Sequence, residues 1–253
     1  MSDRPTGILA AMDEEVRRIR ERVEGGTVVE VGGRAYLLGS IADRPVVVAF
    51  SRWGKVAAAS TATTLIDRFG VSRVIFTGVA GAVDADLGIG DLVVARGLVQ
   101  HDLDARPLLA RFEVPLLDRV EMPTDPQLVA AAVAAVREVL DRDLATMISD
   151  SDRARFGIAT PKVREGLVAS GDRFIADPAE TSRLRRDLPG LLAVEMEGAA
   201  VAQVCFEHGV PCVVVRAISD RADHGAAIDF GAFVSDVASR YTERVVQRLM
   251  ERL

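Results

Sequence analysis

The chain has 253 residues, of which 49% are hydrophobic and 5% aromatic, so it can bury a large and mainly aliphatic core. Its formal net charge of −6 makes its surface poorly suited to nucleic acid or to an anionic membrane. The N-terminal residues show no apolar secretory segment and no apolar run reaches membrane-spanning length, so we expect a cytoplasmic protein without a membrane partner. Cys205 and Cys212 are expected to be buried free thiols, which fits a reducing compartment.

The first half of the chain alternates short apolar runs with helical segments. We expect a strand at 6–11, a helix at 12–23 ended by Gly25-Gly26, two short strands within 27–38, a strand at 45–50, a polar turn at 51–55 leading into a helix to about 69, and a strand at 73–77. Gly78-Val79-Ala80-Gly81 follows this last strand, and its spacing fits neither a dinucleotide fingerprint nor a P-loop. We therefore expect close backbone approach there, to a small ligand or to a neighbouring strand.

The second half continues the alternation and contains the least regular segments. We expect a strand from 92 to about 101, an irregular segment at 102–123, a helix at 125–140 capped by Asp125, a loop or partly mobile segment at 141–161, a strand at 163–170 followed by a turn at 171–175, a helix at 178–188, a helix after Glu197, a strand at 212–218, and a last helix from about 229 to 252. No Pro-, Gly- or Ser-rich linker divides the chain, so we expect one α/β domain over residues 1–253.

The segment from Ala193 to Asp223 has the clearest chemical pattern. Glu195 and Glu197 precede a run of small apolar residues that is typical of a helix buried on most faces. The apolar strand that follows carries one charge, Arg216, which must be paired or face a cavity because an isolated buried charge is costly. Asp220 comes at the end of this strand, and open α/β sheets bind ligands beyond the carboxyl ends of their strands. The segment therefore predicts a ligand site.

This segment also resembles a known family. Val194-Glu195-Met196-Glu197 and Val215-Arg216-Ala217-Ile218-Ser219-Asp220 are similar to the signature pair of the 5′-methylthioadenosine/S-adenosylhomocysteine nucleosidases, in the purine nucleoside phosphorylase and uridine phosphorylase superfamily. The similarity covers nearly the whole chain and is weakest from about 102 to 161. It implies a single-domain, three-layer α/β/α sandwich with a central mixed sheet. It also implies a homodimeric hydrolase that splits such nucleosides into adenine and a 5-thioribose species, with no metal or organic cofactor.

The chemistry of such a hydrolase requires several carboxylates. The leaving purine must be protonated, a water must be activated, and positive charge on the sugar must be stabilised; carboxylates suit all three roles. Four turns beyond predicted strands would meet at one edge of the sheet and bring such groups together. The resemblance implies that Glu15 is the base for water and that Glu197 holds the ribose hydroxyls. Asp220, supported by Ser219, would protonate purine N7.

Further residues are expected around the substrate. The resemblance implies that Met196 packs beneath the sugar, that Phe174 stacks on adenine, and that Ile175 offers backbone groups to the adenine edge. Arg216 would help to orient water and the carboxylates. Phe230 matches a phenylalanine that the family takes from the partner subunit. The other residues expected to line the substrate site are Met12, Trp53, Val79 and Gly81.

Each of these residues also has a plain structural interpretation. Glu15 is compatible with a solvated position in a first helical turn, Glu197 with a helix end, and Asp220 with a turn cap. Arg216 is compatible with an ion pair to Glu195. The residues that fit an ordinary core equally well are Met196 and Phe174.

The three histidines do not predict a metal site, because they are few and scattered. They are His101, His208 and His224. His208 precedes Gly209 and is expected at the C-terminal end of a helix. We expect no metal.

Two turns depart from the family pattern and leave the exact reaction open. Val79 stands where a serine hydroxyl is usual, and Trp53 replaces a smaller residue beside the pocket for the 5′ substituent. A phosphorylase that uses phosphate in place of water is the closest competing interpretation, with Arg52 as its candidate ligand, although an acid at Glu15 would repel a dianion. The sequence is also compatible with a nucleosidase for another adenosine derivative, such as aminodeoxyfutalosine, and with a nucleoside sensor that does not turn its ligand over.

Overall fold

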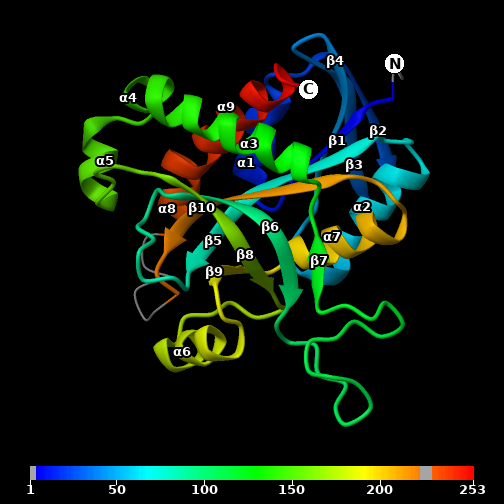
Figure 1. The fold of residues 1–253 in the computed structure, drawn as a ribbon. Helices are drawn as coiled ribbons and strands as arrows, with labels where there is room; N and C mark the ends of the chain where they lie inside the picture. The colour runs from blue at the N-terminus through cyan, green and yellow to red at the C-terminus, as the bar shows by residue number, and fades with distance from the viewer. Residues whose placement is uncertain (1–3, 223–229) are drawn as a thin grey trace.

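All the strands of the computed structural model, which describes residues 4–222 and 230–253, belong to one mixed sheet (Figure 1). In chain order the strands are β1 (Thr6–Ala10), β2 (Glu24–Val31), β3 (Arg34–Ile41), β4 (Arg44–Phe50), β5 (Arg73–Ala82), β6 (Leu92–Gln100), β7 (Glu121–Pro123), β8 (Val163–Ser170), β9 (Leu191–Glu195) and β10 (Cys212–Asp220). Parallel pairs such as β1–β5 and β5–β10 lie beside antiparallel pairs such as β6–β10 and β5–β9.

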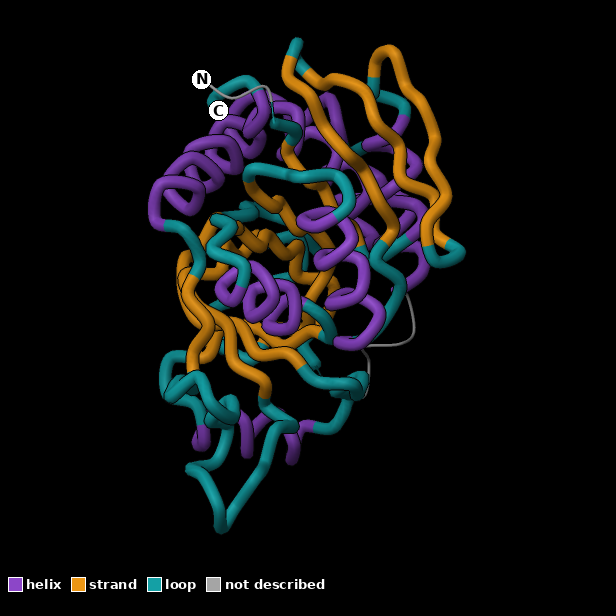
Figure 2. The backbone as a smooth tube through the Cα atoms, turned by 90° about the vertical axis from the view of Figure 1, so that its right-hand side faces the viewer, coloured by secondary structure: helices purple, strands orange, loops and turns teal. Residues whose placement is uncertain are grey.

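Part of the sheet closes into a ring. The hydrogen-bonded order β10-β6-β8-β9-β5 is completed by direct pairing of β10 with β5. Strand β5 reaches both neighbours because it is long: it pairs with β10 from Val74 onward and with β9 at Gly81 and Ala82. From β5 the sheet continues outward through β1, β4, β3 and β2, and this open extension rises at the upper right of Figure 2.

Helices cover both faces of the sheet. They are α1 (Asp13–Arg20), α2 (Lys55–Asp67), α3 (Pro126–Glu138), α4 (Leu144–Met147), α5 (Asp150–Phe156), α6 (Pro178–Asp187), α7 (Gly198–Glu207), α8 (Phe230–Phe233) and α9 (Ser239–Met250). One core lies between the sheet and α1, α3 and α9, and a second lies beneath α2 and α7. Along β1, Ile8 faces the first core and Leu9 the second, which explains why the strand reads as a continuous apolar run. The predicted α/β/α sandwich with a central mixed sheet is confirmed.

Several segment predictions need correction. The helix expected to reach Val23 ends at Arg20, and the strand expected to end at Thr77 continues to Ala82 through the glycine-rich turn. Strands β7 and β9, of three and five residues, were not predicted, and β7 lies at the end of the segment expected to be irregular. The segment 141–161, expected as a loop, contains α4 and α5 and the end of a π-helical turn, Val139–Asp143. Its short helices are held by apolar side chains such as Met147 and Ile148, which pack into the first core.

Several further expectations hold. Both cysteines are free and buried, and Asp125 caps α3 by accepting hydrogen bonds from the N–H groups of Gln127 and Leu128, each at 2.9 Å. The last helix is described from Phe230, with a π-helical turn at Val234–Ala238; its expected start at Asp229, like His224, lies outside the described residues.

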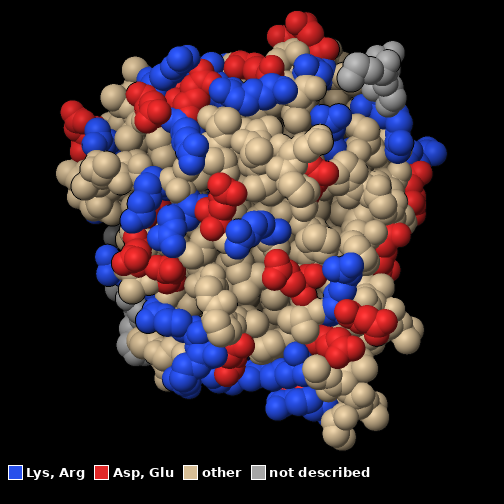
Figure 3. All heavy atoms as spheres, in the orientation of Figure 1, with Lys and Arg blue, Asp and Glu red and all other residues tan. Residues whose placement is uncertain are grey.

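Acidic and basic side chains are interspersed over the face shown in Figure 3. Within the described part of the chain, no helix combines the length and apolar character that crossing a bilayer requires.

Candidate active site

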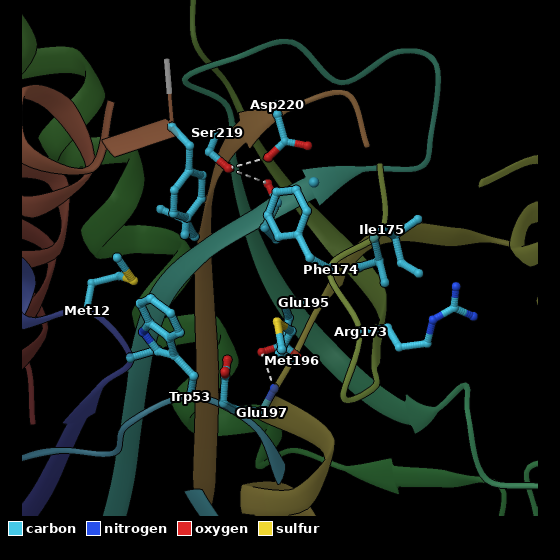
Figure 4. Close-up of a pocket in the computed structure, with 16 residues that line it drawn as sticks. Met12, Trp53, Arg173, Phe174, Ile175, Glu195, Met196, Glu197, Ser219 and Asp220 are labelled. Carbon is cyan, nitrogen blue, oxygen red and sulfur yellow. Dashed lines mark hydrogen bonds between the residues drawn. The ribbon is translucent and has the colours of Figure 1, made fainter. Parts of the chain in front are cut away.

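A cavity of about 690 Å³, counted with its open mouth, lies beyond the carboxyl ends of β5, β9 and β10 (Figure 4). It is lined by Ala11, Met12, Trp53, Val79, Ala80, Gly81, Arg173, Phe174, Ile175, Val194, Glu195, Met196, Glu197, Ser219, Asp220 and Phe230. Asp220 and Ser219 lie on one side of the view, Glu197 lies on the opposite side, and aromatic rings lie between them. Strand ends far apart in the sequence therefore bring the predicted carboxylates to one cavity.

Asp220 is held rigidly at the end of β10. Its Oδ2 accepts a hydrogen bond from the Ser219 hydroxyl, and its Oδ1 accepts one from the N–H of Ala222, both at 2.7 Å. The register of β10 against β5 shifts between Ile218 and Asp220, an irregularity that re-aims side chains at the end of a strand. Asp220 therefore both caps the local turn, as its structural interpretation expected, and lines the cavity.

The glycine-rich end of β5 provides the close approach that the sequence predicted. A side chain at Gly81 would meet Asp220, because an added Cβ would lie 2.9 Å from Oδ1 of that carboxylate. Val79 and Gly81 both line the cavity. The close approach is therefore between β5 and the neighbouring strand β10. Because Gly81 has no side chain, the Asp220 carboxylate can lie against the backbone of β5 and face the cavity.

Glu197 lies at the N-terminal end of α7 and contributes a buried carboxylate to the cavity. Its Oε1 accepts a hydrogen bond of 2.9 Å from the backbone N–H of Gly54, in the turn between β4 and α2. The pKa of Glu197 is raised to about 7, first by burial and then by the nearby charge of Glu195, while Arg216 and the Gly54 N–H oppose the shift. The pKa of the Glu197 carboxyl group therefore lies close to neutral pH.

Glu195 and Arg216 form a buried ion pair beside the cavity. Arg216 Nη2 lies 2.5 Å from Glu195 Oε2, and only 1% and 2% of the two side chains are exposed. Glu195 also accepts hydrogen bonds from the Ser170 hydroxyl and from the N–H of Gly198, which begins α7. Arg216 is not a lining residue, so its expected place among the substrate-binding residues is corrected: its guanidinium orients the Glu195 carboxylate and lies over the Phe76 ring, 4.1 Å from the ring centre.

Replacing Arg216 by Met should destabilise the fold strongly, because it leaves the Glu195 charge buried without its cation. We expect a loss of about 3–5 kcal/mol in the free energy of unfolding, measured by urea denaturation. The same change at Arg142, whose pair with Glu138 is largely exposed on the arginine side, should cost less than about 1 kcal/mol. Equal effects of the two substitutions would contradict this account of the Glu195–Arg216 pair.

Glu15 is completely buried behind the Met12 side of the cavity, so a solvated position in the first helical turn is excluded. Its carboxylate accepts hydrogen bonds from the Met12 N–H at 3.3 Å and from the Thr242 hydroxyl of α9 at 3.1 Å. Burial raises its pKa to about 7, and the positive charge of Arg216 limits the shift. Glu15 is not itself a lining residue; Met12, at the start of its helix, is.

An aromatic and sulfur-containing wall faces the carboxylates. Trp53 and Phe174 both line the cavity and remain 66% and 48% exposed. The Phe230 ring packs edge-on against Phe174, with ring centres 5.8 Å apart. The expectation that the Phe230 position is supplied by a partner subunit is therefore corrected, because this chain places Phe230 in its own cavity. The remaining predicted members of this wall, all lining residues, are Met12, Ile175 and Met196.

Some residues of the site were not predicted, and the phosphorylase interpretation loses support. Arg173, Val194 and Glu195 line the cavity, although the Arg173 side chain points away from the others in Figure 4 and pairs with Glu180 at 2.8 Å. Thr242, the partner of Glu15, carries no sequence signal because it lies in an ordinary amphipathic helix. Arg52 is not a lining residue; its Nη2 donates to the carbonyl of Gly33 at 2.5 Å.

Metal ligands do not gather at this site. Over residues 4–222 and 230–253, no group of three or more His, Cys, Asp or Glu side chains is arranged to hold a metal ion. Buried His101, at the end of β6, has a lowered pKa because of its burial.

This combination of a partly closed mixed sheet and a carboxylate-lined cavity at its strand ends has known counterparts. The family model described as the phosphorylase superfamily matches residues 5–251. A 5′-methylthioadenosine/S-adenosylhomocysteine nucleosidase of Shewanella frigidimarina is 34% identical over 251 residues, which are 98% of this chain and 99% of the relative. The chain belongs to the phosphorylase superfamily and, within it, to the family of 5′-methylthioadenosine/S-adenosylhomocysteine nucleosidases.

Two solved structures show how closely the fold is shared. The S-adenosylhomocysteine nucleosidase of Streptococcus pyogenes, in complex with 5-methylthiotubericidin, aligns with a TM-score of 0.86 at 32% identity, over 100% of this chain and 98% of that one. The futalosine hydrolase of Helicobacter pylori aligns with a TM-score of 0.83 at 34% identity, over 99% of this chain and 98% of that one. The fold is therefore common to relatives with different named substrates.

Proposed function

We propose that this protein hydrolyses the N-glycosidic bond of 5′-methylthioadenosine, of S-adenosylhomocysteine, or of both, releasing adenine and the 5-thioribose species. The observation that carries the proposal is the convergence of Asp220 and Glu197 on opposite sides of one aromatic-walled cavity, with Glu15 buried behind it. The relatives named for this activity support the substrate class. A sensor without turnover would not need three carboxylates in separate environments.

Asp220 is proposed as the acid that protonates purine N7. The proton passes from the carboxyl group to N7, and the C1′–N9 bond breaks as the sugar gains oxocarbenium character. The donors already directed at Asp220, the Ser219 hydroxyl and the Ala222 N–H, stabilise the carboxylate that remains. This arrangement favours release of the proton at the moment when the purine leaves.

Glu15 is proposed as the base. It takes a proton from the water whose oxygen bonds to C1′, so that water supplies the hydroxyl of the sugar product and the proton balance closes through solvent. A base with a pKa of about 7 is well matched to this task near neutral pH. Water is proposed to reach Glu15 beside Met12, which lines the cavity and whose N–H donates to the Glu15 carboxylate.

Glu197 and the apolar wall are proposed to bind the nucleoside. The Glu197 carboxylate accepts hydrogen bonds from the ribose hydroxyls while Met196 packs beneath the sugar. Phe174 stacks on adenine, and Ile175 presents backbone groups to the adenine edge. Trp53, Met12 and Phe230 surround the 5′ substituent.

Phosphorolysis is less favoured than hydrolysis. Its candidate phosphate ligand, Arg52, donates to a backbone carbonyl outside the cavity, and Arg173, the one lining cation among the described residues, pairs with Glu180. Hydrolysis of aminodeoxyfutalosine is a second candidate function, supported by the likeness to the futalosine hydrolase of Helicobacter pylori.

We further propose that the chain works as a single domain within a cytoplasmic homodimer that serves methionine salvage. Exposed apolar side chains on neighbouring elements support the dimer: Val56 on α2 is 81% exposed, Leu116 is 97% exposed, and Phe206 on the adjacent α7 is stacked by Arg119. Exposed apolar side chains of this kind are typical of protein–protein contact surfaces when they gather in one patch.

Adenine release from three nucleosides in phosphate-free buffer tests the substrate class. We expect rapid release from 5′-methylthioadenosine or S-adenosylhomocysteine, and a kcat/KM for aminodeoxyfutalosine at least about tenfold lower than for the better of these two. Release from aminodeoxyfutalosine alone would replace the proposed substrate, and release from none would support a binding protein.

A further inference from the structure

A hydrogen-bonded cluster outside the cavity ties together two turns that contribute lining residues to it. The first turn joins β4 to α2 and carries Trp53 and the Gly54 N–H that holds Glu197. The second follows β8 and carries Phe174 and Ile175. The cluster consists of Lys55, Asp102 and Asp172, and none of these three lines the cavity.

Asp102 is the centre of this cluster because each of its oxygens holds a different turn. Oδ1 accepts from Lys55 Nζ at 2.6 Å, and Oδ2 accepts from the backbone N–H of Asp172 at 2.9 Å. The Lys55 and Asp102 side chains are only 17% and 26% exposed. The pairing also lowers the pKa of Asp102, so the carboxylate remains charged and retains both acceptors.

Asp172 completes the cluster by capping α2 from another part of the chain. The N-cap residue of α2 is Gly54, which offers no side-chain acceptor, and its φ of 87° disfavours other residues. The Asp172 Oδ1 instead accepts the N–H of Lys55, the first residue of α2, at 2.7 Å. At this helix end, the N–H of Lys55 therefore donates to Asp172 and the N–H of Gly54 donates to Glu197.

We infer that Lys55, Asp102 and Asp172 are positioning residues that keep the Gly54 N–H directed at Glu197, and so set the preference of the enzyme for ribose over 2′-deoxyribose. The inference rests on the proposed function, in which Glu197 holds the ribose hydroxyls. Without the cluster the N-terminus of α2 loses its cap, the Gly54 turn moves relative to Glu197, and the carboxylate no longer meets the hydroxyls in a fixed geometry.

The substitution Asp102→Asn tests this directly, because an amide replaces one of the two acceptor oxygens with a donor. One of the contacts to Lys55 and Asp172 must then be lost. The ratio of kcat/KM for 5′-methylthioadenosine to that for its 2′-deoxy analogue should fall about tenfold. Asp102→Glu, which retains two oxygens, should recover part of the ratio, and adding Asp102→Asn to Lys55→Met should change it little further.

Asp187→Asn is the matched control. It breaks an ion pair to Arg111 of 2.7 Å and similar exposure, away from both turns. The control should leave the ratio unchanged, whereas a general loss of folded enzyme would lower both rates together. A ratio within about twofold of wild type in folded Asp102→Asn would overturn the inference.

A second readout does not depend on turnover. Trp53 is the only tryptophan of the chain, and it lies in the turn held by the cluster. Time-resolved fluorescence anisotropy should show larger nanosecond motion of Trp53 in Asp102→Asn than in wild type or Asp187→Asn, and unchanged motion would overturn the positioning role. If wild type cleaves neither nucleoside, the proposed function fails, while the anisotropy still decides whether the cluster holds the turn.

Discussion

Asp220→Asn should lower kcat for 5′-methylthioadenosine by about 10³-fold, because an amide cannot deliver a proton to the leaving purine. The fold should survive, since the asparagine oxygen can still accept the N–H of Ala222. Substrate binding should weaken far less than turnover, and this is measured as nearly unchanged affinity in equilibrium binding alongside the loss of kcat.

A matched control for this substitution is Asp177, the residue that caps the N-terminal end of α6. Asp177 accepts a hydrogen bond of 2.8 Å from the N–H of Ala179, two residues later in the chain, just as Asp220 accepts one of 2.7 Å from the N–H of Ala222. Asp177, however, does not line the cavity. Asp177→Asn should therefore leave kcat unchanged. Turnover by Asp220→Asn near the wild-type rate would remove Asp220 from the role of acid.

Glu15→Gln should remove most turnover and also change how stability depends on pH. In wild type, the pKa of Glu15 is raised from 4.5 to about 7 in the folded state, so the folded protein binds a proton that the unfolded chain releases. The contribution of this group is fully present below pH 4.5 and is lost as the pH rises through 7. A pKa shift of this size corresponds to a loss of about 3 kcal/mol in the free energy of unfolding as the pH rises from below 4.5 to above 7.

Glutamine resembles the protonated glutamate and does not titrate, so Glu15→Gln should match wild type at about pH 4 and exceed its free energy of unfolding at pH 8 by about 3 kcal/mol. Glu21, an exposed neighbour at the end of α1, provides the control: Glu21→Gln should shift neither the pH dependence nor the activity. Parallel stability curves for Glu15→Gln and wild type would mean that Glu15 is not held with a raised pKa.

Much of the site was predictable because its chemistry is local in sequence. Glu197 precedes an apolar run and Asp220 follows one, and a charge in such a place is costly unless it has a function or a partner. Arg216 illustrates the limit of this reasoning: the sequence allowed either a substrate contact or a pair with Glu195, and only the folded geometry decides for the pair. The partner of Glu15, Thr242, is 227 residues away and was not predictable from local pattern.

The architecture was predictable as an alternating α/β chain but not as a closed ring. Closure depends on β10 pairing with β5 and on the five-residue β9, and pairing between distant strands leaves little local signal. The segment 141–161 was mistaken for a loop because helices of four and seven residues are too short to show a periodic pattern. The contacts of Asp102 and Asp172 are likewise long-range.

The most direct test of hydrolysis is to identify the sugar formed from 5′-methylthioadenosine, with and without inorganic phosphate. We predict equal rates of adenine release in both buffers, with free methylthioribose as the only sugar product. Adenine release that requires phosphate and yields the sugar 1-phosphate would contradict the central claim, because phosphate rather than a water activated by Glu15 would then be the nucleophile.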